Sequence, residues 1–328
     1  MADLRTKYLG LELKNPLIVA ASGLTASVEG VKKAIDAGAG AVVLKSLFEE
    51  QLRSEMDIVS KQSLESSHPE AAVFIEEMGV HAGAGAYLDL IRSSKAIAGK
   101  VPIIASVNCI EGDLWVDFAE QIEAAGASAL ELNVGIMPLS AKQDSKELED
   151  LTVSILRTVS VRTDLPLAVK IGPYFTNPAN LVERLSGAGA GAVVLFNRFY
   201  RLDLDLDKMA LKAGPMRSGE DEYHESLRWI CNMYGSVAAE LVGGTGIHSG
   251  ETALKFIAGG ATTVQICSAL YKGGWAAMSR ILLEMEKRMN ELQIASADKL
   301  RGRLSRRSSA ESEKYERLQY IKALTGIS

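Results

Sequence analysis

Apolar residues form eight short unbroken runs along this chain, separated by amphipathic stretches with helical spacing. Four runs stand alone or follow a proline: Pro16–Ala21, Val101–Val107, Pro166–Ile171 and Glu240–Gly243. The other four end a repeated pattern in which glycine and alanine lead into an apolar run: Ala37–Leu44, Ala125–Leu132, Ala188–Leu195 and Gly259–Ile266. Unbroken hydrophobicity is typical of parallel strands that are covered on both faces.

The alternation of eight such strands with helical stretches predicts an α/β fold, a closed (β/α)8 TIM barrel. In each repeat, a glycine predicts the C-cap of a helix and a tight turn into the next strand. A doubly wound open sheet is the alternative, but no Gly-x-Gly-x-x-Gly follows the first strand. We expect one barrel domain over residues 1–295.

Two segments do not fit this alternation. Residues 46–100, after the second strand, are far longer than a usual βα loop. They predict a lid insertion over the barrel mouth, with helices at Glu49–Ser63 and Ala86–Ile97. Residues 296–328 are polar and rich in Lys and Arg, which predicts a basic C-terminal tail. We expect this tail to be solvated and partly ordered, with contacts between subunits as the alternative.

The composition, 47% hydrophobic and 23% charged, is that of an ordinary globular protein. The net charge of −5 disfavours nucleic acid and anionic membranes as partners. Cys109, Cys231 and Cys267 show neither disulfide nor metal spacing, and no apolar run approaches the roughly 20 residues of a membrane span. These features predict a cytoplasmic protein with a small-molecule substrate and no metal site.

Two of the predicted strands end in turns of small residues. The strand Glu240–Gly243 leads into Gly244, Thr245 and Gly246, and the last strand leads into Cys267 and Ser268. The glycines, Gly243 included, allow a sharp turn and the close approach of a ligand. Helix starts after such turns favour an anion, and barrels commonly hold a phosphate after strands 7 and 8. The turns therefore predict a phosphate site, with ordinary tight turns as the simpler alternative.

Polar residues end several of the apolar strands. They are Ser22, Lys45, Ser46, Asn108, Asn133, Lys170 and Asn197. A buried cation is costly without a partner, so the two lysines are poor choices for a core. Because the carboxyl ends of barrel strands meet at one rim, we expect these residues to surround a site opposite the phosphate. A lone lysine at a strand end more often simply reaches solvent.

With these motifs, the chain is similar to the dihydroorotate dehydrogenase family, whose members are FMN-binding barrels of pyrimidine biosynthesis. The resemblance runs from about Leu9 to Leu292. The segments that carry it are Asn15-Pro16, Ala21-Ser22-Gly23, Lys45-Ser46, Met78-Gly79, Glu131-Leu132-Asn133, Val169-Lys170-Ile171, Pro173-Tyr174-Phe175, Asn197, Gly243–Ile247 and Gln265–Leu270. The soluble branch of the family is the better match, because no membrane-seeking helix precedes Leu9.

The resemblance implies roles for individual residues. It assigns the FMN ring to Ala21, Ser22, Gly23, Lys45, Ser46, Asn133 and Lys170, and the FMN phosphate to Gly244, Thr245, Gly246, Cys267 and Ser268. It assigns the substrate to Lys45, Met78, Gly79 and Asn197, and makes Lys45 part of the catalytic site. A cation beside the flavin ring stabilises the anion that forms on two-electron reduction.

The chain departs from the family at the position of the catalytic base. The family pattern Asn-Leu-Ser-Cys-Pro-Asn, or Ser for Cys, is replaced after Asn133 by Val-Gly-Ile-Met-Pro, so the base position falls on Ile136, which cannot accept a proton. Glu76 replaces an asparagine that binds orotate in the family. Ser140 is a weak alternative base, and Glu76, His81 and Tyr174 are further candidates without a motif.

The sequence therefore predicts an FMN-dependent oxidoreductase acting on CH–CH groups, with dihydroorotate or a related dihydropyrimidine-like substrate. One alternative is an FMN-binding electron-relay or non-catalytic subunit that has lost dihydroorotate oxidation. Another is a lyase or isomerase for a phosphorylated metabolite, without flavin. No NAD, FAD or iron–sulfur motif is present in the sequence, so such groups would come from a partner subunit. A homodimer or higher oligomer is compatible with the sequence.

Overall fold

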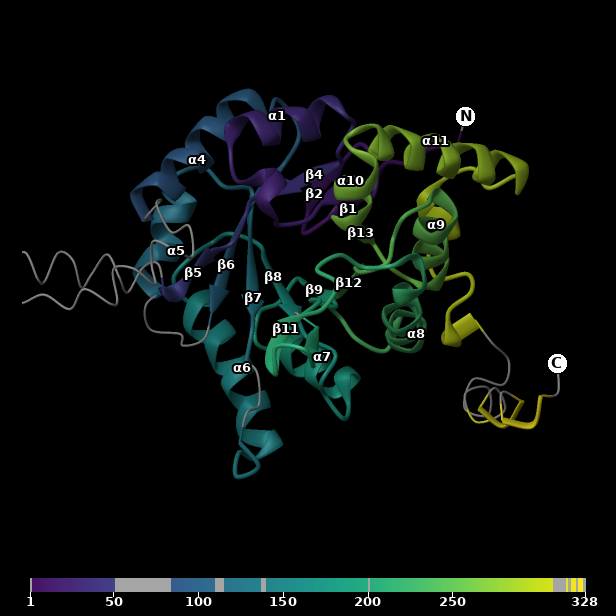
Figure 1. Cartoon of the computed structure of the whole chain (residues 1–328). Helices are drawn as coiled ribbons and strands as arrows, with labels where there is room; N and C mark the ends of the chain where they lie inside the picture. The colour runs from purple at the N-terminus through teal and green to yellow at the C-terminus, as the bar shows by residue number, and fades with distance from the viewer. Residues whose placement is uncertain are drawn as a thin grey trace, which may run out of the picture.

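The computed structural model describes residues 2–50, 84–109, 115–136, 140–199, 201–308, 317, 320–322 and 324–326. Its centre is a ring of parallel strands (Figure 1). These are β3 (Leu17–Val19), β4 (Ala41–Val43), β6 (Ile103–Cys109), β7 (Ala129–Val134), β8 (Leu167–Ile171), β9 (Ala192–Leu195), β12 (Glu240–Gly243) and β13 (Thr263–Ile266). They pair in the order β4–β3–β13–β12–β9–β8–β7–β6, and β4 also pairs with β6. The predicted eight-stranded barrel is confirmed, strand by strand.

Helices surround the barrel. They are α1 (Val28–Asp36), α4 (Ala84–Ile97), α5 (Trp115–Ala124), α6 (Ser145–Ser160), α7 (Pro178–Gly187), α8 (His224–Met233), α9 (Gly250–Gly259) and α11 (Ala276–Glu291). Consecutive helices of this series contact one another from α1 to α11. Local sequence sets where several of them begin, because the N-cap side chains of Ser27, Asp144, Asn177 and Ser249 each accept a backbone N–H of the first turn.

The repeated glycines occupy the position predicted for them. Gly38, Gly126, Gly189 and Gly260 have φ between 92° and 126°, a region that L-residues rarely adopt, and each lies between a helix and the following strand. The N–H of Gly38, for example, donates to the carbonyl of Ile35 at 3.0 Å. The four repeats are therefore four copies of one helix-to-strand turn.

Side chains inside the barrel follow the two-residue period of a strand. Small and branched apolar residues fill its lower part: Ile18, Ala41, Val43, Ile104, Ala129, Ala168, Ala192, Val194 and Val242. The antiparallel hairpin of β1 (Thr6–Tyr8) and β2 (Leu11–Leu13) packs Tyr8, Leu9 and Leu13 against this cluster. Within each strand the alternation continues toward the carboxyl end, so Asn133, Lys170 and Gln265 point into the upper part of the barrel.

The region predicted as a lid, 46–100, is partly barrel. It begins with the short strand β5 (Leu47–Phe48), which pairs with β6, and it ends with α4, which contacts α1, α5 and β6. The predicted helix at Ala86–Ile97 is confirmed as α4, but it belongs to the helical ring. Most of the predicted helix at Glu49–Ser63, and the body of the insertion, lie outside the described residues.

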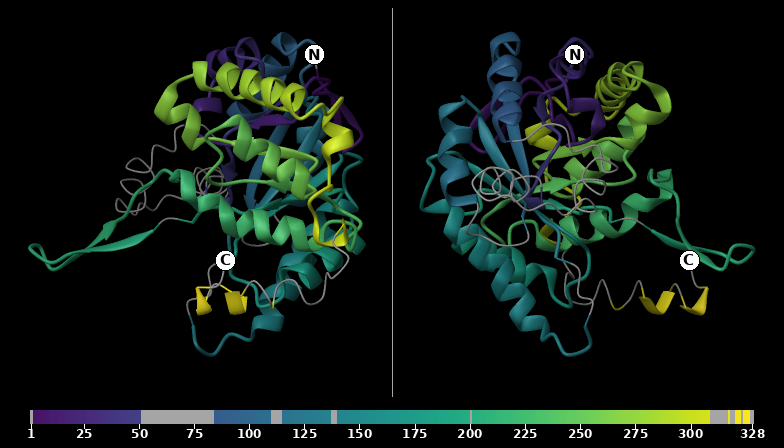
Figure 2. Two further views of the ribbon diagram at one scale, coloured as in Figure 1. Left: turned by 90° about the vertical axis from the view of Figure 1, so that its right-hand side faces the viewer. Right: turned by 60° about the vertical axis from the view of Figure 1, so that its left-hand side comes forward.

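A second hairpin was not predicted. Strands β10 (Leu202–Asp205) and β11 (Ala210–Ala213) follow β9 and pair only with each other among the described strands. Figure 2 shows this hairpin projecting away from the barrel in both views. The 3-10 helix η2 (Glu220–Tyr223) then leads into α8.

The predicted basic tail, residues 296–328, begins with an ordered segment. Residues 296–308 are packed on the barrel: α12 (Ala297–Leu300) buries its two terminal side chains, and the N–H groups of Gly302 and Leu304 donate to the carbonyls of Ile257 and Ala258 at 3.0 and 2.8 Å. Arg301 donates to the Thr6 hydroxyl at 2.5 Å. The apolar residues between the charged ones hold this segment against α9, whereas composition alone suggested a solvated segment.

No helix in the described ranges is both long and apolar enough to cross a lipid bilayer.

Candidate functional site

A polar cluster lies in the upper part of the barrel. Lys170 Nζ on β8 donates to Gln265 Oε1 on β13 at 3.1 Å, and Gln265 Nε2 donates to Glu131 Oε2 on β7. Lys170 Nζ is also 4.0 Å from Glu131 Oε1. The Glu131 side chain is 1% exposed and that of Lys170 is 13% exposed, so the pair is nearly excluded from water. A buried ion pair of this kind holds the lysine in one place.

Two asparagines join β7 and β9 above this cluster. Asn197 Nδ2 donates to Asn133 Oδ1 at 2.8 Å, and the N–H of Asn197 donates to the Ile171 carbonyl at 2.7 Å. Asn133 is paired in register with Lys170 on the adjacent strand. The prediction that the polar strand ends converge is therefore correct for Asn133, Lys170 and Asn197.

A cavity opens beside Lys170 at the carboxyl ends of the strands. Its lining combines the predicted residues Ala21, Lys170, Asn197, Gly244, Thr245, Gly246, Cys267 and Ser268 with Ala20, Phe196, Arg198, Met216, Ser218, Ile247, Gln265 and Ile266. The two predicted turns thus form one wall, with the lysine on another. The predicted residues Ser22, Gly23, Lys45, Ser46 and Asn133 are not part of this lining.

The glycines of the first turn serve different purposes. A Cβ on Gly243 would lie 2.4 Å from the Phe256 ring, so this glycine lets β12 pack on α9 and does not face a ligand. A Cβ on Gly246, whose φ is +73°, would lie 2.5 Å from the Tyr223 nitrogen. A Cβ on Gly244 would meet nothing closer than 3.5 Å. The structure thus gives Gly243 a packing role, and the close ligand approach stays a prediction for Gly244.

The first turn offers unpaired donors in a positive environment. The backbone N–H groups of Thr245, Ile247 and His248 make no hydrogen bond to the described part of the chain, whereas the N–H of Gly246 donates to Ser218 Oγ at 3.2 Å. Lys272 Nζ donates to the Ser218 carbonyl at 3.0 Å, which places a cation beside the turn. Unpaired N–H groups near a cation suit an anion such as a phosphate.

The second turn contributes Cys267 and Ser268. The Ser268 hydroxyl accepts the N–H of Ser218 at 3.0 Å, and because Ser218 Oγ in turn accepts the N–H of Gly246, Ser218 links the two turns. Burial raises the pKa of the Cys267 thiol against the opposing effects of Ser22, Lys170 and Arg217, which keeps the thiol protonated at neutral pH. Cys267 is therefore a small wall residue here rather than a thiolate.

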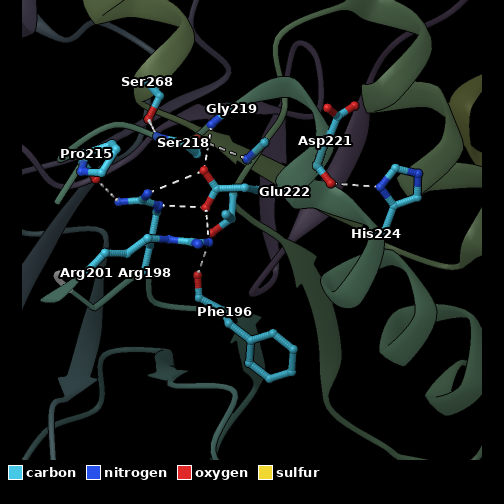
Figure 3. A network of polar contacts seen from close by, with 12 residues as sticks. Phe196, Arg198, Arg201, Pro215, Ser218, Gly219, Asp221, Glu222, His224 and Ser268 are labelled. Carbon is cyan, nitrogen blue, oxygen red and sulfur yellow. Dashed lines mark hydrogen bonds and ion pairs between the residues drawn. The ribbon is translucent and has the colours of Figure 1, made fainter. Parts of the chain in front are cut away.

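An ion cluster that the sequence did not predict closes one side of the cavity. The Glu222 carboxylate accepts from Arg198 Nε at 2.9 Å, from Arg201 Nη2 at 2.6 Å and from the N–H of Gly219 at 2.7 Å, as Figure 3 shows. Burial by itself would raise the pKa of Glu222, but these hydrogen bonds and the two positive charges outweigh it and lower the pKa to about 2. The cluster ties the base of the β10–β11 hairpin to the segment that covers Gly246.

Four predicted residues lie near the rim but outside the cavity. Ser22 caps η1 (Gly23–Thr25) by accepting the N–H of Leu24 at 3.3 Å, and Gly23 lies against the Tyr271 hydroxyl. Lys45 is exposed at the end of β4, and the buried Ser46 hydroxyl is 2.8 Å from that of Ser106. Their assignment to a ligand stays a prediction.

The position of the family base lies at a cavity whose lining mixes apolar side chains with Ser145, Glu149, Thr152 and Thr176. Ile136 lines a second cavity together with Leu148, Tyr174, Phe175 and Phe199. Ser140, the alternative base, is exposed, and its hydroxyl accepts the N–H of Lys142 at 3.2 Å in the turn before α6. Met78, Gly79, Glu76 and His81 lie outside the described residues. Tyr174 is largely exposed.

Sequence reasoning missed Glu131, Gln265, Arg198, Ser218 and Glu222 as site residues. For the first two a signal existed, because a charged or amide side chain inside an otherwise apolar strand needs a buried partner. The other three lie in or beside an irregular segment after β9, where neither periodicity nor a motif marks them. Only the tertiary structure brings that segment over the glycine turn.

Comparisons with known proteins agree with this geometry. The family model described as dihydroorotate dehydrogenase matches residues 3–289. Similar proteins include the catalytic subunit of dihydroorotate dehydrogenase B (NAD(+)) of Thermoplasma acidophilum, 26% identical over 92% of this chain and 99% of the relative. The corresponding subunit of Desulforudis audaxviator is 27% identical over 89% of this chain and 94% of its own length. On the family match over most of its length, on the barrel and on the site at its rim, the chain belongs to the dihydroorotate dehydrogenase family.

Proposed function

We propose that the chain is an FMN-dependent oxidoreductase that acts on the CH–CH group of dihydroorotate or of a related dihydropyrimidine-like substrate. The observation that carries this proposal is the position of Lys170. Its ammonium group is fixed between Glu131 and Gln265 beside a cavity whose opposite wall offers unpaired N–H groups. A fixed cation and an anion cradle on facing walls match a flavin with its phosphate.

The residues present fit FMN. The N–H groups of Thr245, Ile247 and His248, with Ser268 and Lys272 close by, would hold the phosphate. Ala21 and Lys170 would lie along the ring. When bound, FMN supplies a two-electron acceptor for hydride. Lys170 would then stabilise negative charge on the ring, and its contacts with Glu131 and Gln265 hold the cation in place.

The removal of a proton from the substrate is the step for which no residue has yet been assigned. Dihydroorotate must lose a proton as its hydride leaves, and Ile136 at the family position has no lone pair to accept it. Ser140 is exposed and engaged with Lys142. We therefore expect the chain to oxidise dihydroorotate at least ~10²-fold more slowly than a family member with Cys or Ser at that position, the lower end of what a placed base contributes.

A second candidate is an FMN-binding electron-relay or non-catalytic subunit. The cavity around Ile136 favours it, because Leu148, Phe175 and Phe199 line it beside Ile136, and the carboxylate in its described lining, Glu149, is already paired with Arg184 at 3.0 Å. The relatives are described as catalytic subunits of an NAD(+)-linked enzyme. For either candidate we expect electrons to pass to or from a partner subunit.

The test begins with flavin binding. The purified chain should be yellow and hold about one FMN, and a chain that gains no flavin absorbance on incubation with FMN would refute the proposal. Gly244→Asp should weaken FMN binding at least ~10-fold more than its neutral control Gly244→Asn, because it adds a negative charge at the cradle. The two variants have the same shape, and a Cβ at this position would meet nothing closer than 3.5 Å.

Anaerobic stopped-flow mixing then separates the two candidates. Slow bleaching of the flavin by dihydroorotate, with a gain in Ile136→Cys, supports the oxidoreductase. Complete bleaching by dithionite but none by dihydroorotate or other dihydropyrimidines, in either protein, favours the relay. Bleaching by the unmodified chain at the rate of a family member with an intact base would contradict the role given to Ile136, and Ser140→Ala would then be the next variant.

A further inference from the structure

Buried polar atoms without a hydrogen-bond partner are concentrated in one part of the molecule. Among the described residues, six buried side-chain atoms have no such partner. One is Ser94 Oγ on α4, and the other five belong to barrel strands or to the segments that close the lower end of the barrel: Tyr8 Oη, Glu131 Oε1, Thr263 Oγ1, Glu240 Oε2 and Arg301 Nε. A buried polar atom that stays unpaired is costly. Their concentration therefore points to a polar molecule bound among them.

The lowest layer of side chains inside the barrel is built mainly from alanine. In a (β/α)8 barrel, alternate strands of the ring contribute the members of one layer. Strands β4, β7 and β9 contribute Ala41, Ala129 and Ala192 to it. Strand β13 contributes Thr263, which lies two residues before Gln265 and so points to the same side of the strand. Because these side chains are small, the layer has room for Tyr8, which is 1% exposed and packs in the same cluster.

The layer above is bulky on three sides and small on the fourth. Its members, from the other four strands of the ring, are Ile18, Ile104, Ala168 and Val242. Ala168 is paired in register with Glu131 on one side and with Ala192 on the other. The side of the barrel that leads from Tyr8 up to the Glu131 carboxylate is therefore lined by alanines in both layers.

The electrostatics of Tyr8 agree with this position. Burial raises the pKa of the Tyr8 hydroxyl well above its usual range, and the charges of Glu131 and Glu240 raise it further. The hydroxyl therefore keeps its proton at neutral pH and is available as a donor. It lies close enough to both carboxylates to be affected by their charge, but it donates a hydrogen bond to neither. An acceptor between Tyr8 and Glu131 would satisfy both residues.

We propose that the barrel interior binds an ordered water molecule between Tyr8 Oη, Glu131 Oε1 and Thr263 Oγ1. Water both accepts and donates hydrogen bonds, so it accepts from the two hydroxyl groups and donates to the carboxylate. Buried water molecules in proteins make about three hydrogen bonds of this kind. The Glu131 carboxylate is then held by the water from below and by Gln265 and Lys170 from above. The water site is independent of the reaction proposed for the chain and of flavin binding.

The first experiment compares melting temperatures of the full chain and of variants that lose one buried hydroxyl with little change in shape. Thr263→Val and Tyr8→Phe should each lower the melting temperature by about 3 °C or more, because the water and the Glu131 carboxylate lose a partner. The matched control Ser94→Ala removes an unpaired hydroxyl that is 0% exposed on α4, and should leave the melting temperature unchanged or raise it. The double variant Thr263→Val/Tyr8→Phe should lose less than the sum of the single losses, because both residues hold the same water.

A rise in melting temperature for both Thr263→Val and Tyr8→Phe, as for the control, overturns the proposal, because the two hydroxyls would then be unpaired in the folded chain. A high-resolution crystal structure of the unmodified chain is the second experiment and needs no variant. It should show a water molecule within about 3.2 Å of Tyr8 Oη, Glu131 Oε1 and Thr263 Oγ1. A direct hydrogen bond between Tyr8 and Glu131, with no water between them, also overturns the proposal.

Discussion

The two ends of the barrel are built on opposite principles. At the amino ends of the strands, alanine, valine and isoleucine fill the interior, and the β1–β2 hairpin closes it with Tyr8, Leu9 and Leu13. At the carboxyl ends, the interior holds Lys170, Glu131 and Gln265 beside an open cavity, and the neighbouring hairpin β10–β11 stands in solvent. The same two-residue period places both sets of side chains.

This difference separates stability from chemistry within one barrel. The lower end gains from burying apolar surface and has no ligand to accommodate. The upper end holds a cation and a carboxyl group out of water. This burial is costly unless the two charges remain paired with each other. Changes at the lower end should therefore alter stability alone, and changes at the upper end should alter stability and ligand binding together.

The largest expected effect is at the upper end. Lys170→Met leaves the Glu131 carboxyl buried without its cation and should lower the free energy of unfolding by about 4 kcal/mol. The double variant Lys170→Met/Glu131→Gln removes both charges and should regain more than half of that loss. Urea denaturation of the three proteins measures both. If the single variant is as stable as the parent, Lys170 and Glu131 are not energetically coupled. The proposed difference between the two ends of the barrel would then be contradicted.

The same double variant gives a stable protein in which to test the role of the cation. When loaded with FMN, the double variant should have a midpoint potential lower by about 30 mV or more than that of Glu131→Gln alone, equivalent to about 1.4 kcal/mol for two electrons, because these two proteins differ only in the positive charge near the reduced ring. Spectroelectrochemistry measures the potential. An unchanged potential would mean that Lys170 does not face the ring.

The next effect compares the two hairpins directly. Leu13→Ala at the lower end removes a side chain that is 2% exposed and should cost about 3 kcal/mol of unfolding free energy. Leu211→Ala on β11 makes the same chemical change at a side chain that is 75% exposed and should cost less than about 0.5 kcal/mol in the monomer. Thermal and urea unfolding at low protein concentration distinguish them. A large loss for Leu211→Ala would show that the β10–β11 hairpin is covered within its own chain.

The smallest expected effect also concerns the upper end of the barrel. It is a pH-dependent change in the free energy of unfolding. The pKa of Glu222 is lowered from 4.5 to about 2 in the folded chain, so its contribution is complete above pH 4.5 and is lost as the pH falls toward 2. Glu222→Gln should be less stable than the parent by about 2 kcal/mol at pH 7, and the difference should vanish near pH 2. A difference that stays constant over this range would mean that the carboxylate charge is not what binds Arg198 and Arg201.

The sequence predicts well those features of the fold that depend on a few neighbouring residues. The four glycine repeats predict helix ends that the backbone confirms at Gly38, Gly126, Gly189 and Gly260. The convergence of Asn133, Lys170 and Asn197 was predicted for a similar reason, because a polar residue at the end of a buried strand is visible without any knowledge of its partner. Barrel geometry then brings the strand ends together.

By itself, then, the sequence determined the eight strands, the helices between them, the rim that carries the site and the family. Tertiary structure decided which contacts are made across the closed barrel, such as Gln265 with Glu131, 134 residues apart, and Arg301 with Thr6, 295 residues apart. It also decided that Gly243 serves packing, that residues 296–308 are part of the body and that β10–β11 is left uncovered. The periodicity of apolar residues shows which face of a segment is buried. Which other segment covers that face depends on how the whole chain folds in three dimensions.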